Sequence, residues 1–308
     1  MPRQARPGVL KFIHKGHCGF TKTKNLLQEM YFWPGMVQDV KNMVASCDKC
    51  ATFAPSQQRE PLILTKGSFP FEKAGVDLFH ANGKNYMVLV DSFSGFPWVA
   101  KLSSTTTAAV TSQLRRWFAD FGYPKHLRSD GGPQFRTEFA DFCERLGITR
   151  ELASPYNATS NGLAESGVKQ MKYLLLKSTN EQQFRDSLLV WRNTPRQDGL
   201  SPAQLFFGFT QNFGQSIDYA PEYLDRKVAR KTRLDSHDKV KTQFDKASVA
   251  RDGIPPGSIV RIQDPKTKRW SSTGVVESVR DDTRSYSIIC DDGTAILRNR
   301  RFIKLKSA

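Results

Sequence analysis

The chain has 308 residues, of which 39% are hydrophobic, and a formal net charge of +16. This length exceeds that of one ordinary domain and indicates two or three domains with apolar cores. Five cysteines, no apolar leader after Met1 and no apolar run near 18 residues argue against a secreted or membrane-spanning protein, so we expect a soluble protein in a reducing intracellular compartment.

The N-terminal part is expected to be a compact helical unit. Its helical stretch covers residues 8–51 and is followed by a polar connector from Pro55 to Pro61. We therefore place a first domain at residues 1–54 and a second at residues 62–215.

The second domain begins with β-type segments. Residues 74–80, 85–91 and 98–102 predict three sequential antiparallel strands, because the turn signals Asn82-Gly83 and Ser94-Gly95 separate them. Helices are predicted at 105–121, 137–146, 162–178 and 182–192, strands at 125–129 and 148–152, and a short helix at Ser201-Pro202. This order indicates a mixed α/β sheet.

The C-terminal part returns to β periodicity. Residues 216–250 are charged and helix-compatible, which is typical of a linker. Val260 and Ile262 alternate with polar residues, and residues 291–293 (Asp-Asp-Gly) form a hairpin signal. The sequence predicts a small β-barrel at residues 251–308.

The positive charge is concentrated at the two ends. Residues 1–60 and 221–308 hold +13 of the +16, and the middle of the chain is nearly neutral. Basic flanks around a near-neutral centre suit a polyanion, and nucleic acid is the natural one because neutralised phosphates release counterions. A merely soluble basic protein is the alternative.

Two close pairs of metal-binding residues lie at the ends of the helical unit. Two residues separate His14 from His17, and two separate Cys47 from Cys50. Imidazole and thiolate are ligands that Zn²⁺ prefers, and four protein ligands make a structural site, which a domain this small needs as a staple. A chance grouping is the alternative. Cys18 adjoins His17 but has no close-spaced partner.

Three carboxylates form a second constellation. Asp77 lies in an apolar strand, where a carboxylate is costly to bury without a cation. Asp130 follows another strand, and the glycines after it permit close approach by a ligand. Glu165 begins a long helix, with Lys169 and Lys172 on the same face. Metals and phosphates could reach such a site.

With these motifs the chain resembles the integrases of Gypsy-type long-terminal-repeat retrotransposons, which are relatives of retroviral integrases. The resemblance covers nearly the whole chain. The matching segments are His14-Lys15-Gly16-His17, Tyr31-Phe32-Trp33-Pro34-Gly35-Met36, Cys47-Asp48-Lys49-Cys50, Asp77, Ser129-Asp130-Gly131-Gly132-Pro133-Gln134-Phe135, Pro155-Tyr156-Asn157, Asn161-Gly162 and Glu165. Together they are highly specific, whereas any one alone is weak.

The resemblance implies a multidomain protein with a helical zinc-binding domain, a ribonuclease H-like catalytic core and a basic C-terminal Src-homology-3-like β-barrel. It implies that Asp77, Asp130 and Glu165 are catalytic and hold two Mg²⁺ or Mn²⁺ ions, and that one structural Zn²⁺ is bound. It places Gln134, Tyr156, Asn161, Lys169 and Lys172 near DNA.

The expected chemistry is phosphodiester transesterification. Two metal ions about 3.5–4 Å apart can serve the attacking and leaving oxygens without a protein nucleophile. The resemblance implies that water first trims the 3′ ends of the element and that the freed 3′-hydroxyls then attack target DNA. Joining two ends needs more than one catalytic centre, so we expect a homo-oligomer on double-stranded DNA, acting in the nucleus after a cytoplasmic phase.

Two other functions are kept open. One is a catalytically silent, host-retained integrase-like protein that only binds DNA, and the other is a ribonuclease H-type nuclease. The three intact carboxylates argue against the first, and the zinc unit and basic barrel argue against the second.

Several other residues have simpler interpretations. Asp91 is expected to cap a turn, and His80 and His126 to be structural or surface residues. The five tryptophans are expected in cores rather than as stacking platforms. Arg298, Arg300 and Arg301 are expected to contact DNA phosphates, with a solvated, charged sheet edge as the alternative.

Overall fold

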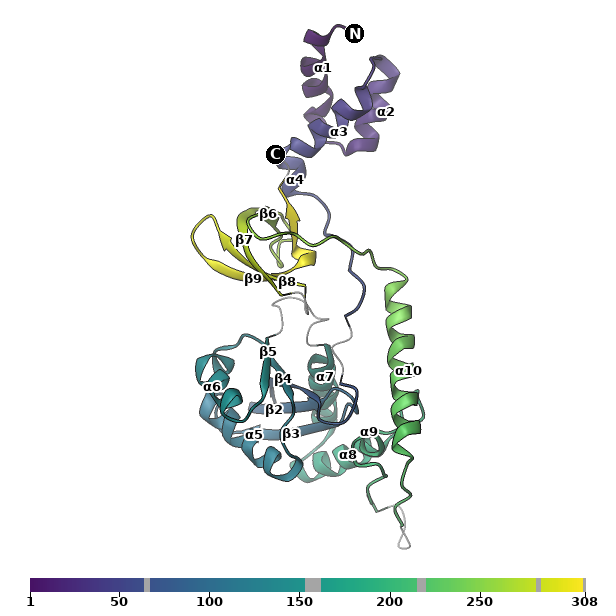
Figure 1. The fold of residues 1–308 in the computed structure, drawn as a ribbon, viewed down its shortest axis with the longest axis vertical. Helices are drawn as coiled ribbons and strands as arrows, with labels where there is room; N and C mark the ends of the chain where they lie inside the picture. The colour runs from purple at the N-terminus through teal and green to yellow at the C-terminus, as the bar shows by residue number, and fades with distance from the viewer. Residues whose placement is uncertain (64–66, 153–161, 215–219, 281–283, 307–308) are drawn as a thin grey trace. The chain divides into compact units, whose positions relative to one another are not determined.

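The computed structural model describes residues 1–63, 67–152, 162–214, 220–280 and 284–306, with 162–165 described by their backbone alone (Figure 1). The chain divides into two compact units, one of residues 1–60 with 250–308 and one of residues 61–249. No helix in these described ranges is long and apolar enough to cross a membrane.

The N-terminal part is helical, as predicted. Its helices are α1 (Arg6–Ile13), α2 (Phe20–Met30), α3 (Met36–Ser46) and α4 (Asp48–Thr52), with a 3-10 turn, η2 (His14–Gly16), after α1. Leu27, Trp33 and Val40 are fully buried in a small core between these helices. The Trp33 ring nitrogen donates a 2.7 Å hydrogen bond to Asp39, which fixes the chain entering α3.

A mixed five-stranded sheet forms the second unit. Its strands are β1 (Lys73–Ala81), β2 (Lys84–Asp91), β3 (Pro97–Leu102), β4 (His126–Ser129) and β5 (Thr149–Leu152), in the order β3-β2-β1-β4-β5. The first three pair antiparallel, as predicted, and β4 pairs parallel with both β1 and β5. The α/β interpretation is therefore confirmed.

Helices cover both faces of this sheet. They are α5 (Thr107–Phe121), α6 (Thr137–Arg145), α7 (Gly162–Lys177), α8 (Glu181–Asn193) and α9 (Pro202–Phe207). Residues of α5, α6 and α9 share one buried cluster with the sheet, and residues of α7 and α8 share the other. Along β1, Val76 belongs to the first cluster and Phe79 to the second. Since side chains alternate along a strand, Asp77 points to the α7 face.

The segment expected to be a linker contains helix α10 (Arg226–Asp245). The carboxylate of Asp225 caps its start by accepting from the backbone N–H groups of Lys227 and Val228. Ala229 of α10 packs against Phe93 and Leu205, so the helix is part of the core unit.

The C-terminal part is an antiparallel sheet of β6 (Ile259–Ile262), β7 (Ser272–Arg280), β8 (Ser285–Cys290), β9 (Ala295–Asn299) and β10 (Ile303–Leu305). The strand order is β10-β6-β7-β8-β9, and β10 does not pair with β9 in the described residues. The predicted β domain is thus present as an open sheet rather than a closed barrel. Val260 and Ile262 are buried, as their alternation predicted.

Candidate functional site

The four predicted zinc ligands come together at one point. One ligand atom from each of His14, His17, Cys47 and Cys50 lies within 4.8 Å of the others. The Cys50 sulfur is 3.3 Å from His14 Nε2 and 3.6 Å from His17 Nδ1, and the Cys47 sulfur is 3.4 Å from His17 Nδ1. A tetrahedral Zn²⁺ with ordinary bond lengths separates its sulfur and nitrogen ligands by roughly 3.5 Å. The four side chains therefore fit this ion.

The local backbone explains why these side chains converge. His17 adopts a left-handed conformation (φ 49°) at the end of η2, which turns its ring towards His14; the two ring centres are 5.0 Å apart. Cys47 is the extended residue between α3 and α4, and Cys50 follows one turn later in α4. Cys18 does not belong to the cluster, as expected.

Burial works against charge at this site in the absence of a cation. Burial lowers the pKa of His14, and the neighbouring His17 lowers it further. Burial also raises the pKa of Cys50, and Cys47 and Cys18 raise it further. Neutral imidazole is the form that binds a metal, whereas the thiol must lose its proton, which a divalent ion favours.

Asp77 is a half-buried carboxylate of the second constellation. Burial raises its pKa to about 6; the N–H of Leu78, which donates a 2.7 Å hydrogen bond to it, opposes this rise, and the charge of Asp130 adds to it. The carboxylates of Asp77 and Asp130 therefore repel each other, although more than fifty residues separate them in the sequence. Two carboxylates that repel each other on one sheet face suit a divalent cation.

Asp130 is exposed just after β4, where its carboxylate accepts a 3.0 Å hydrogen bond from the N–H of Gly132. A Cβ atom on Gly132 would lie 2.5 Å from the amide nitrogen of Gln134 and 3.0 Å from an Asp130 oxygen. A larger residue there would displace the ends of these two polar side chains. Gln134 is thereby placed beside Asp130.

Helix α7 brings the backbone of Glu165 to the same face. A Cβ on Gly167 would meet a Val90 methyl at 2.5 Å, so α7 lies directly on β2 at this residue. Met171, one turn further, is fully buried in the cluster beneath α7. The Glu165 side chain lies outside the described residues.

The structure describes only some of the residues that were expected to bind DNA. Lys169 and Lys172 are exposed on α7, whereas Met171 between them is buried. Tyr156 and Asn161 lie outside the described residues.

The three C-terminal arginines differ in their exposure and in their hydrogen bonds. The Arg300 guanidinium donates to the carbonyl oxygens of Asp252 (3.0 Å) and Ile303 (2.7 Å), and is therefore used to hold the domain together. Arg298 is half-buried and donates to the Leu297 carbonyl. Arg301 is exposed.

Asp91 caps a turn, as predicted. Its carboxylate is fully buried and accepts from the N–H of Phe71 (2.8 Å), the N–H of Ser94 (2.7 Å) and the Ser94 hydroxyl. Burial raises its pKa to about 6 against these hydrogen bonds. The protein itself supplies the hydrogen bonds that the Asp91 carboxylate accepts.

The histidines and tryptophans also follow expectation. His80 is exposed and bonds to Asn85 at 3.0 Å, and His126 lies 3.3 Å from Glu151. Trp33, Trp98, Trp117 and Trp270 are buried, and Trp191 is partly buried against the α7 cluster.

Sequence reasoning missed an ionic cluster beside the carboxylates. Arg128 of β4 pairs with Glu151 of β5 at 2.8 Å, and Glu151 also accepts from Lys73 at 3.2 Å. Arg128 lies two residues before Asp130, which directly follows β4. Leu127, Arg128 and Ser129 are all buried, and a charged residue inside so short a predicted strand is the signal that could have revealed the cluster.

Two segments of the chain match models of known protein families. Residues 1–56 match the integrase zinc binding domain family, and residues 70–158, which include Asp77 and Asp130, match the integrase core domain family.

Three relatives illustrate the similarity. An uncharacterized protein of Caenorhabditis elegans is 29% identical over 222 residues, which cover 68% of this chain and 17% of that protein. The Pro-Pol polyprotein of simian foamy virus type 3 is 29% identical over 232 residues (72% and 19%), and the Gag-Pol polyprotein of koala retrovirus is 30% identical over 225 residues (67% and 13%). The chain thus spans less than a fifth of the length of each of these relatives.

Among solved structures, a chain of the simian T-cell lymphotropic virus intasome, determined by cryo-electron microscopy in complex with PP2A regulatory subunit B56 gamma, has a similar fold. Its TM-score is 0.65 and its sequence identity 18%, with 97% of this chain and 99% of that chain covered.

Proposed function

We propose that this chain, which carries an integrase zinc-binding domain and a ribonuclease H-like integrase core with retroviral Pol homologues, joins DNA ends to a target DNA. The reaction would be metal-dependent 3′-end processing followed by strand transfer. The observation that carries the proposal is that Asp77 lies on β1 and that β4, which pairs parallel with β1, ends directly before Asp130, whose charge adds to the rise of the Asp77 pKa. The motifs quoted above further support a Gypsy-type retrotransposon as the source.

The proposed metal-binding residues are Asp77, Asp130 and Glu165. Bound Mg²⁺ or Mn²⁺ would offset the negative charge that builds up on the phosphodiester during exchange. Asp77 is held in a fixed orientation by the Leu78 N–H, and Asp130 by the Gly132 N–H. The carboxylates are therefore set before DNA arrives, and the chain itself supplies no nucleophile.

The DNA is proposed to lie along the exposed side of α7. Lys169 and Lys172 are exposed one and two turns beyond Glu165, where their ammonium groups can meet phosphates. Gln134 beside Asp130 can donate to a phosphate or base, and Tyr156 and Asn161 are assigned by their motif alone. In the C-terminal domain, which we propose is of the Src-homology-3-like type, we expect the exposed Arg301 to contribute more to phosphate binding than Arg298 or the structurally used Arg300.

We propose four functional segments: residues 1–54 hold the structural zinc, 62–215 catalyse, 216–250 connect and 251–308 bind DNA. The similar fold comes from an intasome, which supports an oligomeric assembly on double-stranded DNA here too. Nuclear action follows from the proposed substrate.

The test is strand transfer by purified protein with Mg²⁺ or Mn²⁺ and labelled terminal-repeat DNA. The wild type is expected to give joined products, Glu165→Gln none, and Glu144→Gln, at an exposed position on α6, wild-type amounts. DNA binding without cleavage or joining by any of the three proteins would favour the DNA-binding alternative. Cleavage of only the RNA strand of a hybrid would favour the nuclease.

A further inference from the structure

Residues 52–57, which we call the bridging segment, join the zinc site to the C-terminal sheet. The segment starts at the last residue of α4, the helix that carries Cys50, and it belongs to the same compact unit as residues 250–308. Hydrogen bonds to the C-terminal domain come from four of its six residues, Thr52, Ala54, Ser56 and Gln57. The bridging segment is therefore part of the structure of both domains.

Trp270 is the main contact of the bridging segment in the C-terminal domain. It is fully buried, and yet it is not a member of the apolar cluster that the described residues of the C-terminal sheet form. Its backbone N–H donates to the Thr52 carbonyl at 2.9 Å, and its indole N–H donates to the Ala54 carbonyl at 3.0 Å. Both N–H groups of this buried tryptophan would lose their acceptors if the bridging segment left.

Two glutamines extend the contact. Gln263 is buried, and its amide nitrogen donates to the Ser56 hydroxyl at 2.8 Å. The Gln57 amide nitrogen donates to the carbonyl oxygens of Arg301 at 3.1 Å and Ile303 at 2.7 Å. Arg301 is the exposed residue that we proposed for phosphate binding. The bridging segment therefore holds the backbone at the start of β10, beside the side chain proposed to meet DNA.

An ion pair also joins the two domains. The guanidinium of Arg261 on β6 donates to the carboxylate of Asp48 on α4. The Asp48 side chain is 83% exposed, and an ion pair that is open to water contributes little to stability. The contact between the domains thus depends mainly on the buried hydrogen bonds of the bridging segment.

The zinc ligands hold the start of this contact. Cys47 is the extended residue directly before α4, and Cys50 lies inside the helix. Since α4 spans only Asp48–Thr52, it is too short to persist in water on its own. Bonds from both cysteines to Zn²⁺ would fix α4, and with it the Thr52 carbonyl that accepts from Trp270. Loss of the ion would remove this support two residues before the contact.

We propose that zinc binding and the folding of the C-terminal β domain are coupled through the bridging segment. The ion then does more than staple the N-terminal helices, because it also orders the backbone around Arg301. The C-terminal domain needs such support, since domains of roughly 60 residues are only marginally stable and its sheet is open between β9 and β10 in the described residues. The coupling goes beyond the proposed reaction and does not depend on catalysis.

The alternative is that the two domains fold independently and touch without affecting each other. Linkage separates the two cases, because coupled equilibria act in both directions. If the ion stabilises the C-terminal domain, the contacts of the C-terminal domain must strengthen zinc binding to the same extent.

The first test is hydrogen exchange of the full chain, measured by mass spectrometry with Zn²⁺ bound and after chelation. Peptides that contain Trp270 and peptides from residues 300–306 are expected to exchange at least roughly tenfold faster after chelation, the effect of losing one buried hydrogen bond. Peptides from β2 and β3 should be unchanged, since these strands belong to the other compact unit. No change in the C-terminal peptides, or equal acceleration in all of these regions, would overturn the coupling.

The second test measures the reverse effect, as zinc affinity in competition with a chromophoric chelator. Gln57→Leu removes two hydrogen bonds to C-terminal carbonyl groups without touching a zinc ligand, and we expect it to bind Zn²⁺ roughly three- to tenfold more weakly than the wild type. Gln58→Leu, at the next and exposed position, is the matched control and should bind like the wild type.

Trp270→Phe tests the same coupling from the C-terminal side. It loses the indole hydrogen bond to the Ala54 carbonyl and should also weaken zinc binding, although it lies far from the ligands in the sequence. Equal zinc affinities of Gln57→Leu and Gln58→Leu, or of Trp270→Phe and the wild type, would show that the two domains are independent and would refute the proposal.

Discussion

Asp77→Asn should stabilise the metal-free protein at neutral pH. Burial raises the Asp77 pKa from 3.8 to about 6, so the folded state holds the Asp77 proton more tightly than the unfolded chain does. The stabilisation of the folded state by the protonated Asp77 is complete below about pH 3.8 and is lost as the pH rises through 6. Above that range the ionised carboxylate costs about 3 kcal/mol, which the neutral amide removes. The Asn side-chain oxygen can still accept from the Leu78 N–H.

The measurement is urea unfolding in EDTA at pH 7.5 and at pH 4.5. The variant should be more stable by about 3 kcal/mol at pH 7.5, and the gain should shrink markedly at pH 4.5. Asp91 titrates in the same window, but it is present in both proteins and cancels in the difference. Asp141→Asn, at an exposed position, should change little.

The second part of the test measures how much Mg²⁺ stabilises each protein against urea. At ten times its Kd it should stabilise the wild type by about 1.4 kcal/mol and Asp77→Asn by less. A variant that is no more stable than the wild type at pH 7.5, or a gain in stability that is equal at both pH values, would refute the idea that ionised Asp77 destabilises the metal-free protein. Equal protection of both proteins by Mg²⁺ would place the metal elsewhere.

Three further substitutions test other parts of the structure. Cys50→Ser, or a zinc chelator, should unfold the N-terminal helices, because the small core around Trp33 depends on the ion; the far-ultraviolet circular dichroism of the full chain should lose helical signal. Gly167→Ala should cost about 1–3 kcal/mol in urea unfolding and weaken Mg²⁺ binding, because its methyl group would push α7 off β2. Arg233→Met should cost about 3 kcal/mol in the same assay, because it leaves Asp198, paired with it at 2.8 Å, buried without that cation.

Each substitution has a matched control. Cys18→Ser should keep the N-terminal fold, and a loss equal to that of Cys50→Ser would argue against the four-ligand site. Gly8→Ala, in helix α1 with open space around it, should be neutral or slightly stabilising. Arg230→Met, at an exposed position on α10, should cost far less than Arg233→Met; equal costs would mean that the buried ion pair does not hold α10.

Local spacing was enough to predict the zinc cluster and most helices and strands. His14 with His17 and Cys47 with Cys50 form close pairs, and short-range geometry brings each pair together. Strand β1 was expected at residues 74–80 and spans Lys73–Ala81, because apolar alternation and the following Asn82-Gly83 turn define it. Thr106 caps α5 by accepting from the Ala109 N–H, close to the predicted start of the helix at residue 105.

Helix α10 shows a packing that sequence patterns do not reveal. Its buried residues are Ala229, Arg233 and His237, four residues apart on one face. Two of the three are polar, so a search for apolar periodicity finds no core-facing stripe, and the segment was interpreted as a linker. The partners that make this burial tolerable, Asp198 and the Phe93 carbonyl, come from distant parts of the chain.

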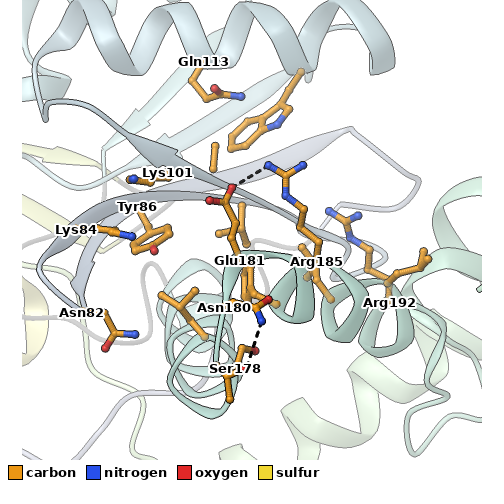
Figure 2. Close-up of a pocket in the computed structure, with 18 residues that line it drawn as sticks. Asn82, Lys84, Tyr86, Lys101, Gln113, Ser178, Asn180, Glu181, Arg185 and Arg192 are labelled. Carbon is orange, nitrogen blue, oxygen red and sulfur yellow. Dashed lines mark hydrogen bonds and ion pairs between the residues drawn. The ribbon is translucent and has the colours of Figure 1, made fainter.

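The sequence by itself determined which residues form the zinc site and which carboxylates are suited to metal chemistry, because residue type and short spacing decide both. Only the tertiary structure decided that Asp77 and Asp130 repel each other, since that depends on β4 pairing parallel with β1. The structure alone also revealed the pocket lined by Lys101 of β3 and Arg185 of α8 (Figure 2), because these two residues lie far apart in the sequence. Such features follow from contacts between distant residues, which local patterns do not encode.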